Sequence, residues 1–236
     1  MKKETVLING CSTGLGLDLF NSLNKKKYKI LGLTSKIRVD YKNIHYYNPR
    51  KEINLSLSLE TFLKKNNIDH VIHCAGGGLG YRSSTLEINK LKELFDLNFF
   101  SIYQLNRSLI LNKKNKKKKL NIIMIGALAG IETVGYLGYS AAKSVLFNYN
   151  KNLSKYFKKA NVTSKLIVPS FFHSTRGSLS RLKKRKPSIF ETINKKKPLS
   201  STDLINTVTY LLKKESESLN GSSINLSKFR SSGVYL

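Results

Sequence analysis

The sequence predicts an α/β fold: a doubly wound parallel sheet of about seven strands, flanked by helices, in a single domain over residues 1–236. Short apolar runs alternate with longer segments of helical periodicity along the whole chain. A length of 236 residues suits one such domain with a full-sized core. A hydrophobic content of 40% and the lack of long low-complexity tracts argue against disorder.

Short buried-type runs such as Thr5-Val6-Leu7-Ile8 indicate the strands. We expect strands at 5–9, 29–34, 43–48, 70–73, 121–125, 164–168 and 223–226. Helical periodicity predicts helices at 15–24, 58–65, 89–111, 137–157 and 202–213. Ser200 or Ser201 can cap the last helix, with Asp203 in its first turn.

The segment 176–198 is polar and basic, and we predict that it forms a lid with a short helix over a substrate site. It contains the basic groups 181–186 and 195–197. This charge favours an anionic substrate, with plain solvation as the alternative.

The formal net charge is +28, but its distribution matters more than its total. Most lysine groups follow a predicted helix and precede a strand: 25–27, 64–65, 113–114, 116–119, 158–159 and 213–214. In a parallel sheet these connections share the face opposite the ligand crevice, where lysines complement the helix dipoles. We therefore predict a solvated basic face and no specific nucleic-acid partner.

The first residues, the lack of a long apolar run and the low cysteine content lead us to expect a cytoplasmic protein without a membrane partner. Residues 1–4 lead directly into the first strand, and no apolar run is long enough to span a bilayer. Cys11 and Cys74 are too few for a disulfide framework. We expect two small buried thiols, with a redox pair as the alternative, and no metal site.

A glycine-rich turn joins the first strand to the first helix. Gly10, Gly14 and Gly16 allow the backbone to turn sharply and to approach phosphate oxygens closely. The turn also contains Ser12, Thr13 and Leu15. Such a turn at a helix N-terminus suits the pyrophosphate of a dinucleotide on a Rossmann-type sheet.

The end of the second strand indicates which dinucleotide is bound. An NAD site normally places a carboxylate here, whereas this chain has none before Asp40. Ser35, Lys36 and Arg38 suit a 2′-phosphate instead. NADP(H) is therefore the expected cofactor, and NAD(H) is less favoured.

Tyr139 and Lys143 are four residues apart, which places a phenol and an ammonium on one face of a helix. A free tyrosine has a pKa of about 10 and carries protons poorly at neutral pH. A nearby ammonium, together with a nicotinamide charge, is expected to lower that pKa. The pair therefore predicts a tyrosine acting as acid or base.

This Tyr-x3-Lys pair and the glycine spacing resemble the classical short-chain dehydrogenase/reductase family. The resemblance implies that Tyr139 transfers the proton and that Lys143 binds the nicotinamide ribose. It also implies that Asn98 holds a water in the proton relay; a helix-kinking polar residue is the alternative. Pro169 and Ser174 match the segment that holds the nicotinamide amide.

The segment His73-Cys74-Ala75-Gly76 resembles the family's Asn-Asn-Ala-Gly, which lines the adenosine side. Cys74, Ala75 and Gly76 are therefore expected at the cofactor. The form His-x-Ala also occurs in the extended, nucleotide-sugar branch of the superfamily. For His73 we favour packing or a ribose contact over catalysis.

The family's catalytic serine is missing. Its position falls on Gly126 by spacing from Tyr139, or on Ala127 by alignment with Leu128-Ala129-Gly130, and neither carries a hydroxyl. A water or Thr133 can substitute, the substrate can supply the group, or the protein binds cofactor without turnover. Ser170 and the segment 227–229 also depart from the family pattern.

These features predict an NADP(H)-dependent oxidoreductase that interconverts a ketone and a secondary alcohol, with a phosphorylated, nucleotide-linked or carrier-bound substrate. The alternatives are a non-catalytic NADP-binding regulatory or scaffold protein and a sugar-nucleotide epimerase or dehydratase. The resemblance further implies a homodimer or homotetramer through the long helices around the fifth strand. The apolar residues that would allow this contact are Leu94, Phe95, Ile102, Leu105, Leu109, Phe147 and Tyr149.

Overall fold

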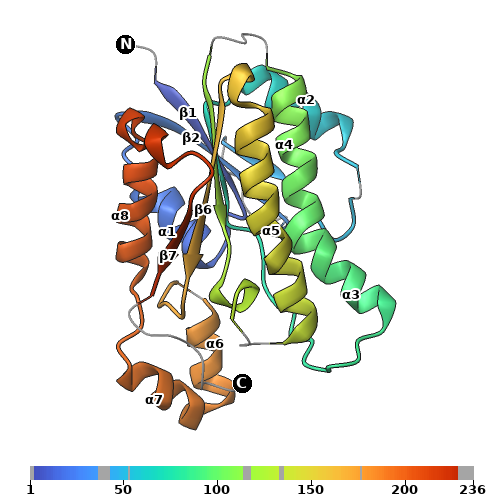
Figure 1. Cartoon of the computed structure of the whole chain (residues 1–236), viewed down its shortest axis with the longest axis vertical. Helices are drawn as coiled ribbons and strands as arrows, with labels where there is room; N and C mark the ends of the chain where they lie inside the picture. The colour runs from blue at the N-terminus through green and yellow to red at the C-terminus, as the bar shows by residue number, and fades with distance from the viewer. Residues whose placement is uncertain are drawn as a thin grey trace.

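The computed structural model describes residues 3–36, 43–52, 54–113, 118–132, 136–175 and 177–227. In these ranges seven strands form one sheet in the order β3-β2-β1-β4-β5-β6-β7, and every neighbouring pair is parallel. Helices cover both faces of the sheet (Figure 1). The predicted doubly wound α/β fold is therefore confirmed.

The strands lie where the sequence places them, with ends shifted by one or two residues. They are β1 (Glu4–Asn9), β2 (Tyr28–Thr34), β3 (Ile44–Tyr46), β4 (His70–His73), β5 (Leu120–Ile125), β6 (Val162–Pro169) and β7 (Ser223–Leu226). The central strands β4, β5 and β6 are buried along their whole length. This burial on both faces suits the apolar run of β5, whereas β4 and β6 also bury polar side chains such as His73 and Lys165.

Two helices, α1 (Gly14–Ser22) and α8 (Ser201–Leu211), cover one face of the sheet (Figure 1). The other face packs against α2 (Leu57–Asn66), α4 (Ser101–Leu111) and α5 (Leu137–Tyr156).

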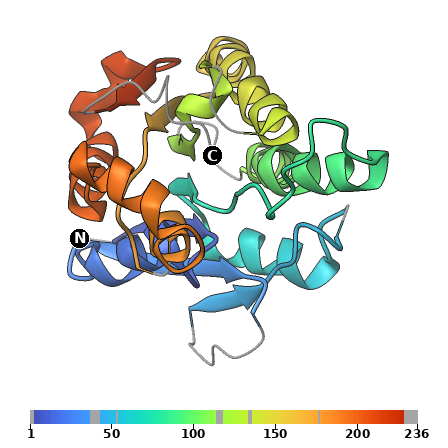
Figure 2. The same ribbon diagram turned by 90° about the horizontal axis from the view of Figure 1, so that it is seen from below.

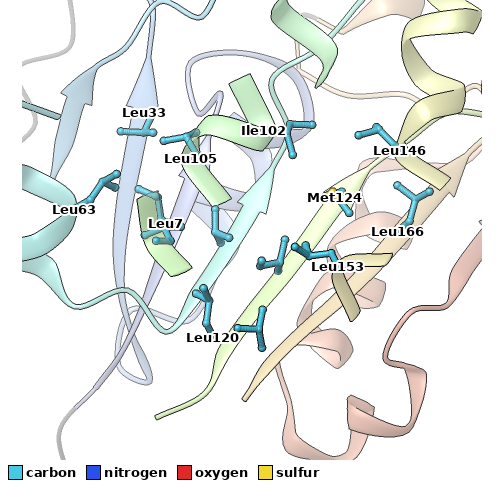
Figure 3. Close-up of a cluster of buried hydrophobic side chains, with 14 of the residues drawn as sticks. Leu7, Leu33, Leu63, Ile102, Leu105, Leu120, Met124, Leu146, Leu153 and Leu166 are labelled. Atoms are coloured by element: carbon cyan, nitrogen blue, oxygen red, sulfur yellow. The ribbon is translucent and has the colours of Figure 1, made fainter. Parts of the chain in front are cut away.

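Alternate residues of β1 divide between two hydrophobic cores. Leu7 packs in the core beneath α2 and α4, near Leu63 and Leu105 (Figure 3), whereas Val6 and Ile8 join the core beneath α1 and α8.

The helix expected over 89–111 is interrupted, which corrects that prediction. It consists of α3 (Ile88–Phe95), a π-helical turn η1 (Asp96–Phe100) and α4. Asn98 is fully buried in the π-turn, and its Nδ2 donates to the carbonyl oxygen of Leu94 at 2.9 Å. The amide side chain therefore satisfies a carbonyl group where the regular α-helical pattern is broken.

The predicted cap of the last helix is confirmed, with Ser200 as the capping residue. The backbone N–H of Asp203 donates to Ser200 Oγ at 3.2 Å, and Ser200 N–H donates to Asp203 Oδ2 at 2.8 Å. This reciprocal capping box stabilises the start of α8 by about 1 kcal/mol.

The predicted lid segment holds two helices instead of one, α6 (Ser178–Arg185) and α7 (Pro187–Lys195). They have their own small core of Leu179, Phe190 and Ile193. The pair lies beyond the carboxyl edge of the sheet (Figures 1 and 2).

Short helical turns complete the secondary structure: η2 (Leu128–Gly130), η3 (Lys158–Ala160) and η4 (Lys214–Leu219). No helix in the described ranges is both long and apolar enough to cross a membrane.

Four of the residues expected at a subunit contact belong to the core instead. Leu94, Ile102, Leu105 and Leu109 are at most 7% exposed. The exposed apolar residues of α4 and α5 are different ones: Tyr103, Leu111, Leu137 and Tyr156. Helical periodicity identified an apolar stripe, but this stripe faces the sheet rather than solvent.

Candidate active site

A cavity of about 310 Å³ opens at the carboxyl edge of the sheet. We call it the carboxyl-edge cavity. The last residues of three strands, Asn9 of β1, Thr34 of β2 and Ile125 of β5, line it. Because the strand order reverses at β1, between β2 and β4, the cavity lies at the topological switch point of the sheet. Ligands of open parallel sheets bind at this place.

The glycine turn forms one wall of the carboxyl-edge cavity. Gly10 has φ +90°, and a Cβ there would lie 2.6 Å from the backbone N of Ala75. A Cβ on Gly16 would overlap the carbonyl oxygen of Gly10. Only glycine therefore lets α1 begin so close to β1 and β4. The first turn of α1 contains no acidic residue, and its positive dipole end faces the cavity.

Most residues expected at the cofactor meet in this cavity. Those that line it are Gly10, Ser12, Thr13, Gly14, Leu15, Ser35, Cys74, Ala75, Gly76, Tyr139, Lys143 and Ser174. They come from five separate parts of the chain that the sheet topology brings together.

Five residues from the same predictions are not among those that line the cavity. Gly16 packs beneath the turn, and Pro169 is buried at the end of β6. Lys36 is exposed beside the end of β2, and Asn98 lies behind the wall. Arg38 is outside the described residues.

Further residues line the cavity that the sequence did not single out for the cofactor: Asn9, Leu33, Thr34, Tyr47, Pro49, Gly77, Leu97, Ile125, Phe172, Gly177 and Arg181. Asn9, Thr34 and Ile125 end parallel strands, which is a signal that could have identified them. No local pattern separates Arg181 from its basic neighbours.

Tyr139 and Lys143 belong to α5, and both line the cavity. Lys143 is 3% exposed; its Nζ donates to the carbonyl oxygen of Ile125 at 3.0 Å and lies 6.0 Å from the ring centre of Tyr139. Burial lowers the pKa of Lys143 to about 8.

Burial also raises the pKa of the Tyr139 phenol to about 12, opposite to the lowering expected from its ammonium neighbour. Desolvation of the phenolate therefore affects this pKa more than the neighbouring ammonium of Lys143 does. One consequence is that Tyr139 carries its proton throughout the neutral pH range.

Asn98 fixes the loop that lies against Lys143. Its Oδ1 accepts from Gly77 N–H at 3.0 Å, and its Nδ2 donates to the Gly77 carbonyl oxygen at 3.0 Å. A Cβ on Gly76 would lie 2.9 Å from Asn98 Oδ1 and 3.0 Å from Lys143 Nζ. The side chains of Asn98 and Lys143 therefore meet around the Gly76–Gly77 backbone, and Asn98 positions this wall of the cavity.

His73 and the two cysteines lack the properties of reactive groups. The ring of His73 is fully buried and hydrogen-bonded to Asn106 at 2.8 Å and Asn9 at 3.3 Å. Burial lowers the pKa of His73 to about 4, which suits a neutral packing residue. Burial raises the pKa of Cys11 to about 11 and that of Cys74 to about 12, so both thiols stay protonated.

The end of β5 lacks a hydroxyl in the described structure. Gly126 lines the cavity, but a Cβ there would lie 3.2 Å from Leu166 Cδ1 and 3.3 Å from the Ile167 carbonyl oxygen. Ala127 already carries a methyl group on extended backbone and is partly exposed. A hydroxyl can therefore be added with less crowding at Ala127. Thr133 lies outside the described residues.

The charge of the cavity favours an anionic ligand. Among the described residues that line it, none is aspartate or glutamate, and the charged ones are Lys143 and Arg181. Backbone amides of the glycine turn and the hydroxyls of Ser12, Thr13 and Ser35 add neutral hydrogen-bonding groups. This donor set fits the phosphates and riboses of a dinucleotide.

Comparison with known proteins points to one family. The sequence model of the short chain dehydrogenase family matches residues 56–185. The chain is 22% identical over 248 residues to the 3-oxoacyl-[acyl-carrier-protein] reductase FabG of Buchnera aphidicola subsp. Schizaphis graminum, covering 100% of this chain and 99% of that protein. It is 30% identical over 174 residues to the probable short-chain type dehydrogenase/reductase VdlC of Helicobacter pylori, covering 69% of this chain and 63% of that protein.

Solved structures share the fold at low sequence identity. An oxidoreductase of the short chain dehydrogenase/reductase family from Burkholderia thailandensis superposes with a TM-score of 0.83 at 16% identity, covering 97% of this chain and 92% of that one. ElxO with NADP bound superposes with a TM-score of 0.79 at 15% identity, covering 95% of this chain and 97% of that one. A 4-hydroxyisoleucine dehydrogenase complexed with NADH superposes with a TM-score of 0.76 at 19% identity, covering 95% of this chain and 96% of that one.

Proposed function

Because the chain belongs to the short-chain dehydrogenase family, and is therefore an oxidoreductase, we propose that it interconverts a ketone and a secondary alcohol with NADP(H). The convergence of the glycine turn and the Tyr139–Lys143 pair on one carboxyl-edge cavity carries the proposal. Two groups that a hydride-transfer enzyme needs, a dinucleotide cradle and a proton donor, therefore face the same space.

When bound, NADPH would supply the hydride for the carbonyl carbon of the ketone and would become NADP+. Tyr139 gives its phenolic proton to the carbonyl oxygen, and in the reverse direction the phenolate takes that proton back. Lys143 stabilises the phenolate by its charge and would hold the nicotinamide ribose. Asn98 keeps Gly76 and Gly77 against Lys143, so that the lysine stays directed at the cavity.

Two observations support NADP(H) over NAD(H) as the cofactor. No described residue lining the cavity carries a carboxylate that could accept from a ribose 2′-hydroxyl, and Ser35 lines it at the end of β2. Solved neighbours include one protein with NADP and another with NADH, so the fold is compatible with either.

We expect calorimetry to give a Kd at least about tenfold lower for NADPH than for NADH, because a charged hydrogen bond contributes roughly 1.5–3 kcal/mol. Ser35→Asp should reverse the preference by repelling the 2′-phosphate. Ser35→Ala, which adds no charge, should keep it. A wild-type preference for NADH of about tenfold or more would reject this cofactor assignment.

For the substrate we propose an anionic, carrier-bound 3-oxoacyl thioester. The full-length match to a 3-oxoacyl-[acyl-carrier-protein] reductase and the cationic α6 support this choice. Lys183, Lys184 and Arg185 in the last turn of α6 would attract an acidic carrier. We further propose a cytoplasmic homodimer or homotetramer that uses exposed residues of α4 and α5 such as Tyr103 and Tyr156.

A second candidate, a non-catalytic NADP-binding protein, is favoured by the absence of a hydroxyl at Gly126 and Ala127. Restoring one tests it. If the enzyme lacks a hydrogen-bond donor for the reacting oxygen, Ala127→Ser should raise kcat by about 100-fold without changing the Kd for NADPH. Ala129→Ser, in the adjacent helical turn, is the matched control. Activity that appears only in Ala127→Ser would favour the non-catalytic protein, whereas wild-type turnover would exclude it.

A further inference from the structure

The loop that follows β6 is fastened to the glycine turn. Gly14 N–H donates to the carbonyl oxygen of Thr175 at 2.6 Å, and Thr175 N–H donates to Asp18 Oδ2 at 3.2 Å. Gly14 and Asp18 both belong to α1, so this loop is held against the positive end of that helix. The fastening determines where the next helix, α6, begins.

Arg181 lies in the first turn of α6, the helix that follows this loop. Its backbone N–H donates to the Gly177 carbonyl oxygen at 3.3 Å, and Gly177 N–H donates to the Ser174 carbonyl oxygen at 3.0 Å. Helical side chains tilt towards the helix N-terminus, which directs Arg181 back towards Ser174 and Gly177. All three residues line the carboxyl-edge cavity. Seen from below, α6 lies over the β1–α1 unit and away from α5 (Figure 2).

The two cationic side chains among the described residues that line the cavity, Lys143 and Arg181, come from different sides of it. Lys143 is buried on the α5 side, where its Nζ donates to the Ile125 carbonyl oxygen. Arg181 is the other cation among the described lining residues, and it belongs to the side formed by the glycine turn. A dinucleotide pyrophosphate carries two negative charges, and the helix N-terminus supplies about half a positive charge.

We propose that Arg181 binds the pyrophosphate of the dinucleotide cofactor, opposite the amides of the glycine turn. The planar guanidinium can donate two parallel hydrogen bonds to phosphate oxygens. Arg181 is then a cofactor-binding residue on the lid, and it couples α6 to the bound cofactor. This inference rests on the proposed function, because it requires that a dinucleotide occupies the cavity.

Calorimetric Kd values for NADPH and NADH test the inference. Arg181→Gln should weaken both cofactors by the same factor, roughly 10- to 100-fold, because both contain the pyrophosphate. Arg181→Lys should recover part of the loss. Lys186→Gln removes one charge directly after the same helix at a residue that does not line the cavity, and the cofactor Kd values should stay within about twofold of wild type. Adenosine 2′-monophosphate, which lacks a pyrophosphate, should bind wild type and Arg181→Gln equally.

Four results would overturn the inference: unchanged cofactor Kd values in Arg181→Gln, a loss confined to NADPH, an equal loss in Lys186→Gln, or no recovery in Arg181→Lys. An unchanged Kd with a raised KM for the ketone would assign Arg181 to the substrate instead. If the wild type binds neither cofactor, the proposed function itself fails, and that outcome is recognisable before any variant is made. Unliganded melting curves should superimpose and thereby separate lost binding from lost folding.

Discussion

Tyr139→Phe is expected to reduce kcat for ketone reduction by roughly 10²- to 10⁴-fold, the range that one positioned acid contributes. Burial raises the pKa of the phenol to about 12, so the wild-type side chain holds the proton that the reduction consumes. Phenylalanine keeps the ring and loses the hydroxyl group that carries this proton. The Kd for NADPH should therefore stay within about twofold. The measurement is NADPH oxidation with the acetoacetyl thioester of pantetheine.

Tyr136→Phe is the matched control for this prediction. Tyr136 precedes the first turn of α5, packs near Arg82 and is not among the residues that line the cavity. The control should retain wild-type turnover. Undiminished turnover in Tyr139→Phe would remove this residue from the mechanism.

Gly10→Ala is expected to raise the Kd for NADPH by more than about 100-fold and to lower the free energy of unfolding by about 1–3 kcal/mol. The added Cβ would lie 2.6 Å from Ala75 N and 2.8 Å from Ala75 Cα, both backbone atoms. The φ of +90° adds strain for any residue with a Cβ. The turn must therefore move away from β4, which opens the wall that faces the cofactor. Calorimetry and urea unfolding measure the two effects.

Gly80→Ala is the control that introduces backbone strain without a close contact between the added Cβ and another residue. Gly80 has a similar φ of +83°, but a Cβ there would have no heavy atom within 4 Å. This variant should lose some stability through strain and keep its affinity for NADPH. If Gly10→Ala and Gly80→Ala bind NADPH equally well, close packing of the glycine turn is not what shapes the site.

The sequence predicts the fold and half of the site because these features depend on local patterns. Tyr139 and Lys143 share a helix face by spacing alone, and both line the cavity. The strand residues Leu7 and Ile8 enter opposite cores because successive side chains alternate. The capping box of Ser200 and Asp203 is likewise a local pattern.

The remaining features depend on contacts between distant segments. The π-turn at Asn98 occurs where that side chain also holds Gly77, which is 21 residues away in the sequence. Arg181 lines the cavity because Thr175 is fastened to Gly14 and Asp18, a contact across more than 150 residues. The raised pKa of Tyr139 follows from burial, which spacing cannot reveal. Propensity and periodicity contain none of this information.

The most direct test of hydride transfer at this site uses NADPH that carries deuterium at the transferred position of the nicotinamide. With the acetoacetyl thioester of pantetheine, we predict one deuterium on the carbinol carbon of each alcohol formed. Tyr139→Phe should form this labelled alcohol at least about 100-fold more slowly. Alcohol without label, or labelled alcohol formed equally well by Tyr139→Phe, would contradict this mechanism.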